Sequence, residues 1–130
     1  MAGILALNEL LSSMNPILQE DEYIFCCLGG TLSDYIHLNP LASYVEDEGL
    51  TLILTAKTAE QAGITYECKY HLITLNVHSS LEAVGLTAAV SAKLTEHNIS
   101  ANVVAAFYHD HIFVNTEKSL AALNALKEIV

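Results

Sequence analysis

Alternating hydrophobic and polar positions give the clearest pattern in this chain, and they lie in its second half. Between His71 and His78, Ile73, Leu75 and Val77 are separated by polar residues, which is the period of a β-strand with one buried face. The pattern therefore predicts a half-buried strand over this range.

An amphipathic helix is expected after this strand. Ser79 and Glu82 have the spacing of a capping box, which favours a helix start. Asn98 tolerates left-handed backbone angles and is expected to end the helix. Between these signals one apolar stripe recurs every four residues, at Leu86, Val90 and Leu94.

A hairpin and a final helix complete this half. Residues 100–108 and 111–115 are rich in Val, Ile and Phe and flank a polar His109-Asp110 connection, which predicts a hairpin turn there. Thr116 is expected to cap the last helix. Its apolar seam is expected at Leu120, Leu123, Leu126 and Ile129. From about residue 66 the order is strand, helix, strand, strand, helix, which is the ferredoxin-like split β-α-β plan without its final strand.

The first half has weaker patterns. They predict a helix with an apolar seam ended by Asn15-Pro16, a buried strand at 23–28, strands at 42–45 and 50–55, and a short helix at 58–62. The seam consists of Ile4, Leu7, Leu11 and Met14. The acidic runs 20–22 and 46–48 are expected to be solvated loops. Because a half of ~65 residues is marginal alone, residues 1–65 are expected to be a degenerate copy of residues 66–130 that shares its core, in an α+β, ferredoxin-like fold.

Charge and composition narrow the function classes. Among 130 residues, 15 are acidic and all 5 cations are lysine, so the formal net charge is −10. Without arginine and with this charge, nucleic acid is not an expected partner. Apolar runs are too short to span a membrane, and the start lacks a basic secretory pattern, so a cytoplasmic location is expected. Cys26, Cys27 and Cys68 are expected to be small hydrophobes in a reduced core.

Several segments together resemble a known family. Residues 72–77, 84–90 and 98–103 resemble ACT domains, the regulatory modules found behind aspartate kinases and other amino-acid enzymes. Residues 80–88, 108–111 and 46–51 are similar to a group of stand-alone bacterial proteins built from two ACT-like halves with no catalytic domain. The resemblance implies a βαββαβ sheet with both helices on one face, side-by-side pairing with a partner, and small effectors, usually amino acids, bound between paired units.

The resemblance also implies a ligand site in the loop between the first strand and first helix of the second half. The residues that map onto it are His78, Ser79, Ser80, Val84, Gly85, Leu86 and Thr87, with Asn102 from the next strand; Val84 stands where many ACT loops carry proline. The residues favour the same loop independently, because Gly85 lets a ligand approach the backbone and amides at a helix start suit a carboxylate. The alternative is that Gly85 lies inside a helix begun at Ser80, at a cost of ~1 kcal/mol relative to alanine.

A secondary candidate site is His109, Asp110 and His111, with His78 and His97 elsewhere in the chain. Imidazoles with a carboxylate could hold zinc or iron, or act as a general acid or base. Turn chemistry explains Asp110 without a metal, so no metal or cofactor is expected. His37 and His71 have no partner visible in the sequence and are expected to face solvent or to be satisfied locally.

Three functions remain open. The sequence has no glycine-rich phosphate loop, nucleophile elbow or Cys-x-x-Cys motif, which argues against an enzyme. The leading hypothesis is a homodimeric, non-catalytic module that binds a small molecule, most simply an amino acid. The alternatives are a metal- or histidine-dependent enzyme using His109, Asp110 and His111, and a protein interaction domain with no small ligand.

Overall fold

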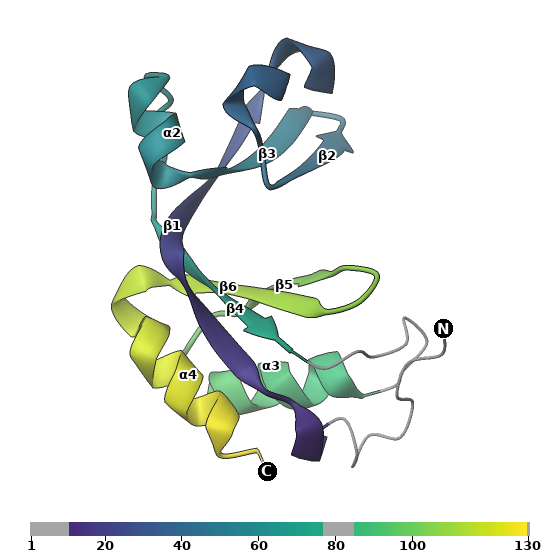
Figure 1. Cartoon of the computed structure of the whole chain (residues 1–130), viewed down its shortest axis with the longest axis vertical. Helices are drawn as coiled ribbons and strands as arrows, with labels where there is room; N and C mark the ends of the chain where they lie inside the picture. The colour runs from purple at the N-terminus through teal and green to yellow at the C-terminus, as the bar shows by residue number, and fades with distance from the viewer. Residues whose placement is uncertain (1–10, 77–84, 130) are drawn as a thin grey trace. The chain divides into compact units, whose positions relative to one another are not determined.

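The computed structural model describes residues 11–76 and 85–129. Figure 1 labels the strands and longer helices, which follow in chain order. They are β1 (Pro16–Leu28), β2 (Ala42–Glu46), β3 (Gly49–Thr55), α2 (Ala56–Gln61), β4 (Tyr70–Leu75), α3 (Leu86–Glu96), β5 (Asn102–Ala105), β6 (Asp110–Asn115) and α4 (Ser119–Lys127). Short 3-10 turns occupy Leu32–Asp34, Ile36–Leu38 and Thr116–Lys118. None of the helices in the described ranges has the length and apolar character needed to cross a membrane.

The chain forms two compact units. The first unit combines Met1–Glu20 with His71–Val130, and the second unit is Asp21–Tyr70. Hydrogen bonds link the strands in the order β2-β3-β1-β4-β6-β5, so β1 gives its first residues to one unit and its last residues to the other. Compared with the expected halves 1–65 and 66–130, the opening segment belongs with the C-terminal part of the chain.

The first unit has an α+β architecture with a buried core between strands and helices. In Figure 1, α3 and α4 lie together against the strands of this unit. The expected stripe of α3 is confirmed, because Leu86, Val90 and Leu94 are all buried. The core cluster also contains Met14, Ile73, Leu75, Ile99, Ile112, Val114, Ala122, Ala125 and Leu126. β4 is buried on both faces at residues 72–75, so the half-buried strand predicted from its alternation is wrong there.

The last helix starts later than predicted. Asn115, not Thr116, caps the 3-10 turn, since its side chain accepts the N–H of Glu117. This turn delays α4 until Ser119, and Leu120 is then 67% exposed. The predicted seam is wrong at Leu120 only, because Leu126 is fully buried and Leu123 and Ile129 pack partly buried against the same core. The other buried residues of α4 are Ser119, Ala122 and Ala125.

The second unit is built on two antiparallel pairings. β1 pairs with β3 from Tyr23↔Thr55 to Leu28↔Leu50, and β2 pairs with β3. The strands predicted at 42–45 and 50–55 are confirmed. The short helix begins two residues earlier than expected, because the Thr55 hydroxyl accepts the Thr58 N–H at 3.2 Å and caps it. Its core cluster is Ile24, Leu50, Leu52, Leu54, Ala56 and Ala59.

β1 is longer than the sequence predicted. It starts at Pro16 and runs through the acidic run 20–22, so the solvated loop expected there is wrong. Residues 20 and 21 are exposed within the strand, and pairing with β3 begins only at Tyr23. The first part of β1 lies next to β4, where Gln19 Nε2 donates to Thr74 Oγ1 at 3.3 Å. It thereby supplies the strand that the C-terminal half lacks.

The cysteines do not form a core. Cys26 is half-buried, whereas Cys27 and Cys68 are exposed, and all three are free thiols. Successive residues of a strand point to opposite faces, which separates Cys26 from Cys27. The expectation of three buried cysteines is therefore wrong for two of them.

Candidate functional site

The loop predicted to bind a ligand ends at a left-handed glycine. Gly85 has φ 97° and ψ −14° and is the N-cap residue of α3. The alternative that Gly85 lies inside a helix begun at Ser80 is therefore wrong, because α3 starts at Leu86. His78, Ser79, Ser80 and Val84, and the capping box at Ser79 and Glu82, lie outside the described residues.

The start of α3 has the features of an anion site. Leu86 is buried and anchors the first turn, while Thr87 and Ala88 are exposed on its solvent side. The carbonyl of Gly85 accepts the first helical hydrogen bond, from the Ala89 N–H at 2.9 Å. The preceding N–H groups have no acceptor within the helix, and the helix dipole makes this end positive. A carboxylate placed there would find both donors and favourable charge.

Asn102 has a structural contact in the described part of the chain. It is the first residue of β5 and lies opposite Phe113 in the antiparallel pairing with β6. Its side-chain amide donates to the carbonyl oxygen of Phe113 at 3.2 Å. One donor of Asn102 thus holds the hairpin together.

The hairpin turn lies earlier than the predicted His109-Asp110 connection. Ala106 N–H donates to the His109 carbonyl at 3.1 Å, and Ala105 pairs with Asp110. Asp110 is therefore the first residue of β6, with only 9% of its surface exposed. Turn chemistry does not explain this carboxylate. Burial raises the pKa of Asp110, and the nearby His111 and His109 oppose that shift.

His111 lies on the other face of β6 and contacts neighbouring strands. Its Nδ1 is 3.1 Å from Thr74 Oγ1, which also accepts the Gln19 amide. Burial lowers the pKa of His111, His109 lowers it further, and Asp110 acts in the opposite direction. His71, expected to be solvent-facing or locally satisfied, instead places Nδ1 3.1 Å from Thr116 Oγ1, 45 residues away.

The His109-Asp110-His111 segment does not bring its three side chains together as ligands. Asp110 and His111 are consecutive strand residues and point to opposite faces of the sheet. Within residues 11–76 and 85–129, no group of three or more His, Cys, Asp or Glu side chains could hold a metal ion.

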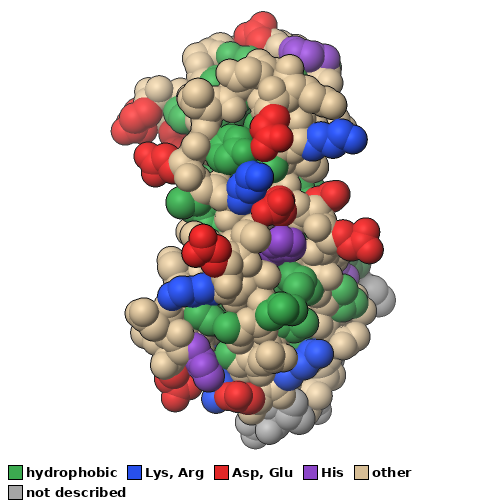
Figure 2. All heavy atoms as spheres, turned by 90° about the vertical axis from the view of Figure 1, so that its left-hand side faces the viewer, with side chains coloured by type: hydrophobic (Ala, Val, Ile, Leu, Met, Phe, Trp, Pro, Cys, Tyr) green, Lys and Arg blue, Asp and Glu red, His purple; other side chains and the backbone are tan. Residues whose placement is uncertain are grey.

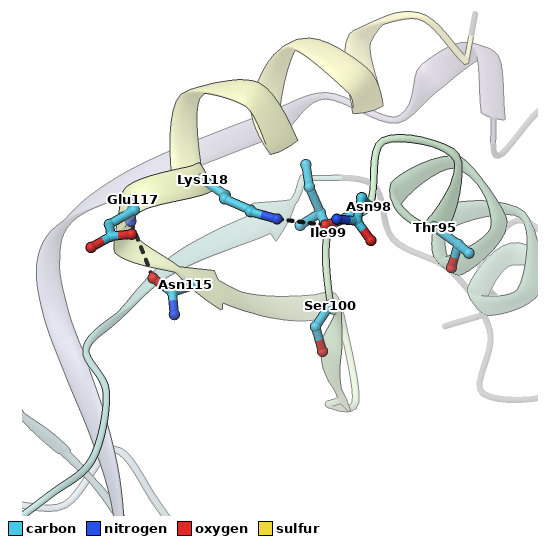
Figure 3. A pocket seen from close by; sticks show the side chains of 7 residues that line it. All are labelled: Thr95, Asn98, Ile99, Ser100, Asn115, Glu117 and Lys118. Atoms are coloured by element: carbon cyan, nitrogen blue, oxygen red, sulfur yellow. Dashed lines mark hydrogen bonds between the residues drawn. The ribbon is translucent and has the colours of Figure 1, made fainter.

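A concavity of about 490 Å³ lies at the C-terminal end of α3 (Figure 3). Lys118 extends across it and its Nζ donates to the carbonyl of Asn98 at 2.7 Å. Asn98 has φ 58°, which confirms the predicted left-handed helix stop. The sequence did not reveal this concavity, because its lining comes from two separate segments, 95–100 and 115–118. The lining residues are Thr95, Asn98, Ile99, Ser100, Asn115, Glu117 and Lys118.

A second concavity, of about 480 Å³, lies in the second unit. Phe25 and Tyr70 form one edge-to-face aromatic pair there, with ring centroids 5.3 Å apart. Tyr66 donates to Glu60 Oε2 at 2.6 Å, and this hydrogen bond raises the pKa of Tyr66. The lining residues are Phe25, Thr65, Tyr66, Glu67, Cys68 and Tyr70.

The surface carries more acid than base. Figure 2 shows Asp and Glu side chains spread over the face in view, with isolated lysines between them. A net charge of −10 repels anions at long range, so an anionic ligand needs a local site to bind.

Comparison with known proteins identifies the family. The ACT domain family matches residues 2–71 and, separately, residues 67–128. A protein of unknown function from Vibrio cholerae, described as a possible transport protein, is 56% identical, with a TM-score of 0.88 over 95% of this chain and 94% of its own.

More distant structures share the fold. The regulatory subunit of aspartate kinase from Thermus flavus is 10% identical, with a TM-score of 0.61 over 89% of this chain and 97% of its own. Aspartokinase III from E. coli, in complex with aspartate and ADP, is 12% identical, with a TM-score of 0.63 over 88% of this chain and 33% of its own. No curated protein sequence matches the chain. With two consecutive family matches that together span nearly all of it, the chain belongs to the ACT domain family as a tandem of two such domains.

Proposed function

We propose that this protein is a regulatory module without catalytic activity, and that it binds an amino acid whose carboxylate lies at the start of α3. The observation that carries the proposal is Gly85, a left-handed residue placed directly before the first turn of an eleven-residue helix. Membership of the ACT domain family and the likeness in fold to aspartate kinase regulatory subunits support a ligand-binding, regulatory role.

Backbone N–H groups can bind a carboxylate in a chain that has few cationic side chains. The first turn of α3 carries no acidic residue, and its basic residue, Lys93, lies in the last turn. Amides and the helix dipole therefore supply the positive potential at this end without a cationic side chain. Gly85 adds access, because it has no Cβ to obstruct an approaching carboxylate.

A thermal-shift screen of the full-length protein against the proteinogenic amino acids tests the proposal. A ligand at a hundredfold excess over its Kd stabilises the folded state by ~2.7 kcal/mol. Gly85→Val is expected to abolish that stabilisation, because a branched side chain blocks the approach and disfavours the left-handed conformation.

Gly63→Val is the matched control. Gly63 is also left-handed, with φ +70°, and a Cβ added there would meet no atom within 4 Å. This variant is expected to lose intrinsic stability in the same way but to keep the ligand-induced shift. If no amino acid stabilises the parent protein, or if Gly85→Val responds as the parent does, the proposal is wrong.

We also propose that the module is a homodimer. β2 is at one end of the strand order, and its Tyr44 and Val45 are 72% and 82% exposed. An exposed edge strand with apolar side chains favours pairing with another chain. Sedimentation at tens of micromolar is expected to show a dimer, which Val45→Lys weakens and the exposed control Gln61→Lys does not. A parent protein that sediments only as a monomer contradicts this.

A further inference from the structure

Asp110 is a buried carboxylate at one end of the core of the first unit. Two side-chain contacts give the relative direction of β4 and β6: Thr74 meets His111, and His71 meets Thr116. The positions rise along one strand as they fall along the other, so β4 and β6 run antiparallel. Asp110, the first residue of β6, therefore lies toward the end of β4 that Leu75 forms.

The side chain of Asp110 is on the sheet face that α3 and α4 cover. Ile112 and Val114, the alternate positions along β6, belong to the helix-side core cluster, so Asp110 shares their face. Leu75 and Leu86, the last residue of β4 and the first of α3, belong to the same cluster. Asp110 therefore faces the core cluster to which the first residue of α3 also belongs.

This carboxylate has no cationic side chain to balance it in the described residues. The five lysines are the chain's only Lys or Arg residues, and all five are described. The ion pairs between described residues involve Lys69, Lys93 and His97, while Lys118 donates to the Asn98 carbonyl. A carboxylate with 9% exposure is costly to ionise without a partner, and burial accordingly raises the pKa of Asp110.

We propose that Asp110 binds the ammonium group of the ligand while the first-turn amides of α3 bind its carboxylate; this inference rests on the proposed function. The Asp110 carboxylate is negative and the helix start is positive, which matches the two charges of a zwitterionic ligand. An ammonium ion supplies a positive charge that no lysine in the described ranges is shown to place there. The ligand is then a free α-amino acid, and neither an N-blocked amino acid nor a simple carboxylic acid satisfies the site.

Three probe mixtures on the full-length protein test this inference: the free amino acids, their N-acetyl derivatives and their C-terminal amides. Only the free amino acids are expected to raise the melting temperature. Asp110→Asn keeps the shape of the side chain but removes its charge, and is expected to raise the half-maximal concentration by ~tenfold or more. Asp47→Asn, in the exposed turn between β2 and β3, makes the same chemical change and is expected to respond like the parent.

The outcomes separate the two proposals. Asp110 does not bind the ammonium group if the N-acetyl derivatives stabilise the parent protein as well as the free amino acids do. The same conclusion follows if Asp110→Asn has the half-maximal concentration of the parent. In either case the proposed function stands. If no mixture shifts the parent protein, the proposed function itself is overturned. The N-acetyl comparison uses only the parent chain, so it decides the question even if Asp110→Asn does not fold.

Discussion

The imidazole Nδ1 of His111 lies 3.1 Å from the hydroxyl of Thr74, joining β6 to β4. Thr74 Oγ1 also accepts the Gln19 amide at 3.3 Å, and its hydroxyl can still either donate to His111 Nδ1 or accept from it, according to the tautomer of the imidazole. Burial of His111 lowers its pKa and so favours the neutral imidazole.

Folding stability is therefore expected to fall as the pH drops below the ordinary histidine value of 6.5. The unfolded chain takes up the proton first, because the folded pKa is lower, and protonation then favours unfolding by at most ~1.4 kcal/mol per pH unit. Urea unfolding from about pH 8 to about pH 5.5 measures the slope, which His111→Gln is expected to reduce.

Exposed His37 gives the control, and His37→Gln is expected to keep the parent slope. Asp110 contributes with the opposite sign, because its raised pKa lets the folded state bind a proton before the unfolded state does. Comparing variant with parent at each pH separates the two groups. An unchanged slope in His111→Gln would show that His111 does not carry the effect.

Gly85→Ala is expected to destabilise the protein by about 1–2 kcal/mol, because an L-residue is strained at φ 97°. Gly63→Ala, at φ 70°, is expected to cost a similar amount. Urea unfolding of both variants measures the cost. A gain of ~1 kcal/mol on Gly85→Ala, the value for a glycine inside a helix, would contradict the N-cap assignment.

The contact between Lys118 and Asn98 is expected to hold the end of α3. Asn98→Ala is expected to cost ~1 kcal/mol because alanine disfavours φ 58°, whereas Asn98→Gly is expected to be nearly neutral. Lys118→Met loses the hydrogen bond to the Asn98 carbonyl and is expected to cost ~0.5 kcal/mol. Lys57→Met, at an exposed position of α2, is the control, and equal losses in both lysine variants would assign the effect to charge alone.

Deleting residues 1–28 is expected to unfold the remainder. Met14 belongs to the core of the first unit and Ile24 to that of the second, and β1 lies between β3 and β4 in the strand order. Far-UV circular dichroism with thermal melting measures the outcome. A truncated chain that melts cooperatively at the parent temperature would contradict the role of β1.

Local pattern was sufficient for several elements. The spacing of Leu86, Val90 and Leu94 predicted the buried face of α3, and Asn98 its left-handed end. These features depend on neighbours within a helical turn, so the sequence contains the information directly. The run of strand-favouring residues in β3 and the motifs that resemble ACT domains could likewise be recognised from the sequence alone.

The candidate site was predictable only in part. The sequence pointed to Gly85, but its helix-interior alternative could be rejected only once φ was known. Asp110 was assigned to a turn because Asp is common in turns, and the β5–β6 register moved the turn to residues 106–109.

The sequence by itself determined the buried face and the end of α3, the strands β2 and β3, and the resemblance to the family to which the chain belongs. Tertiary structure decided the length of β1, the start of α4 and the burial of Asp110. The deciding contacts join distant segments: Gln19 to Thr74 across 55 residues, and Thr74 to His111 across 37. Strand register and the start of a helix depend on such long-range contacts, which a local pattern of hydrophobic residues does not predict.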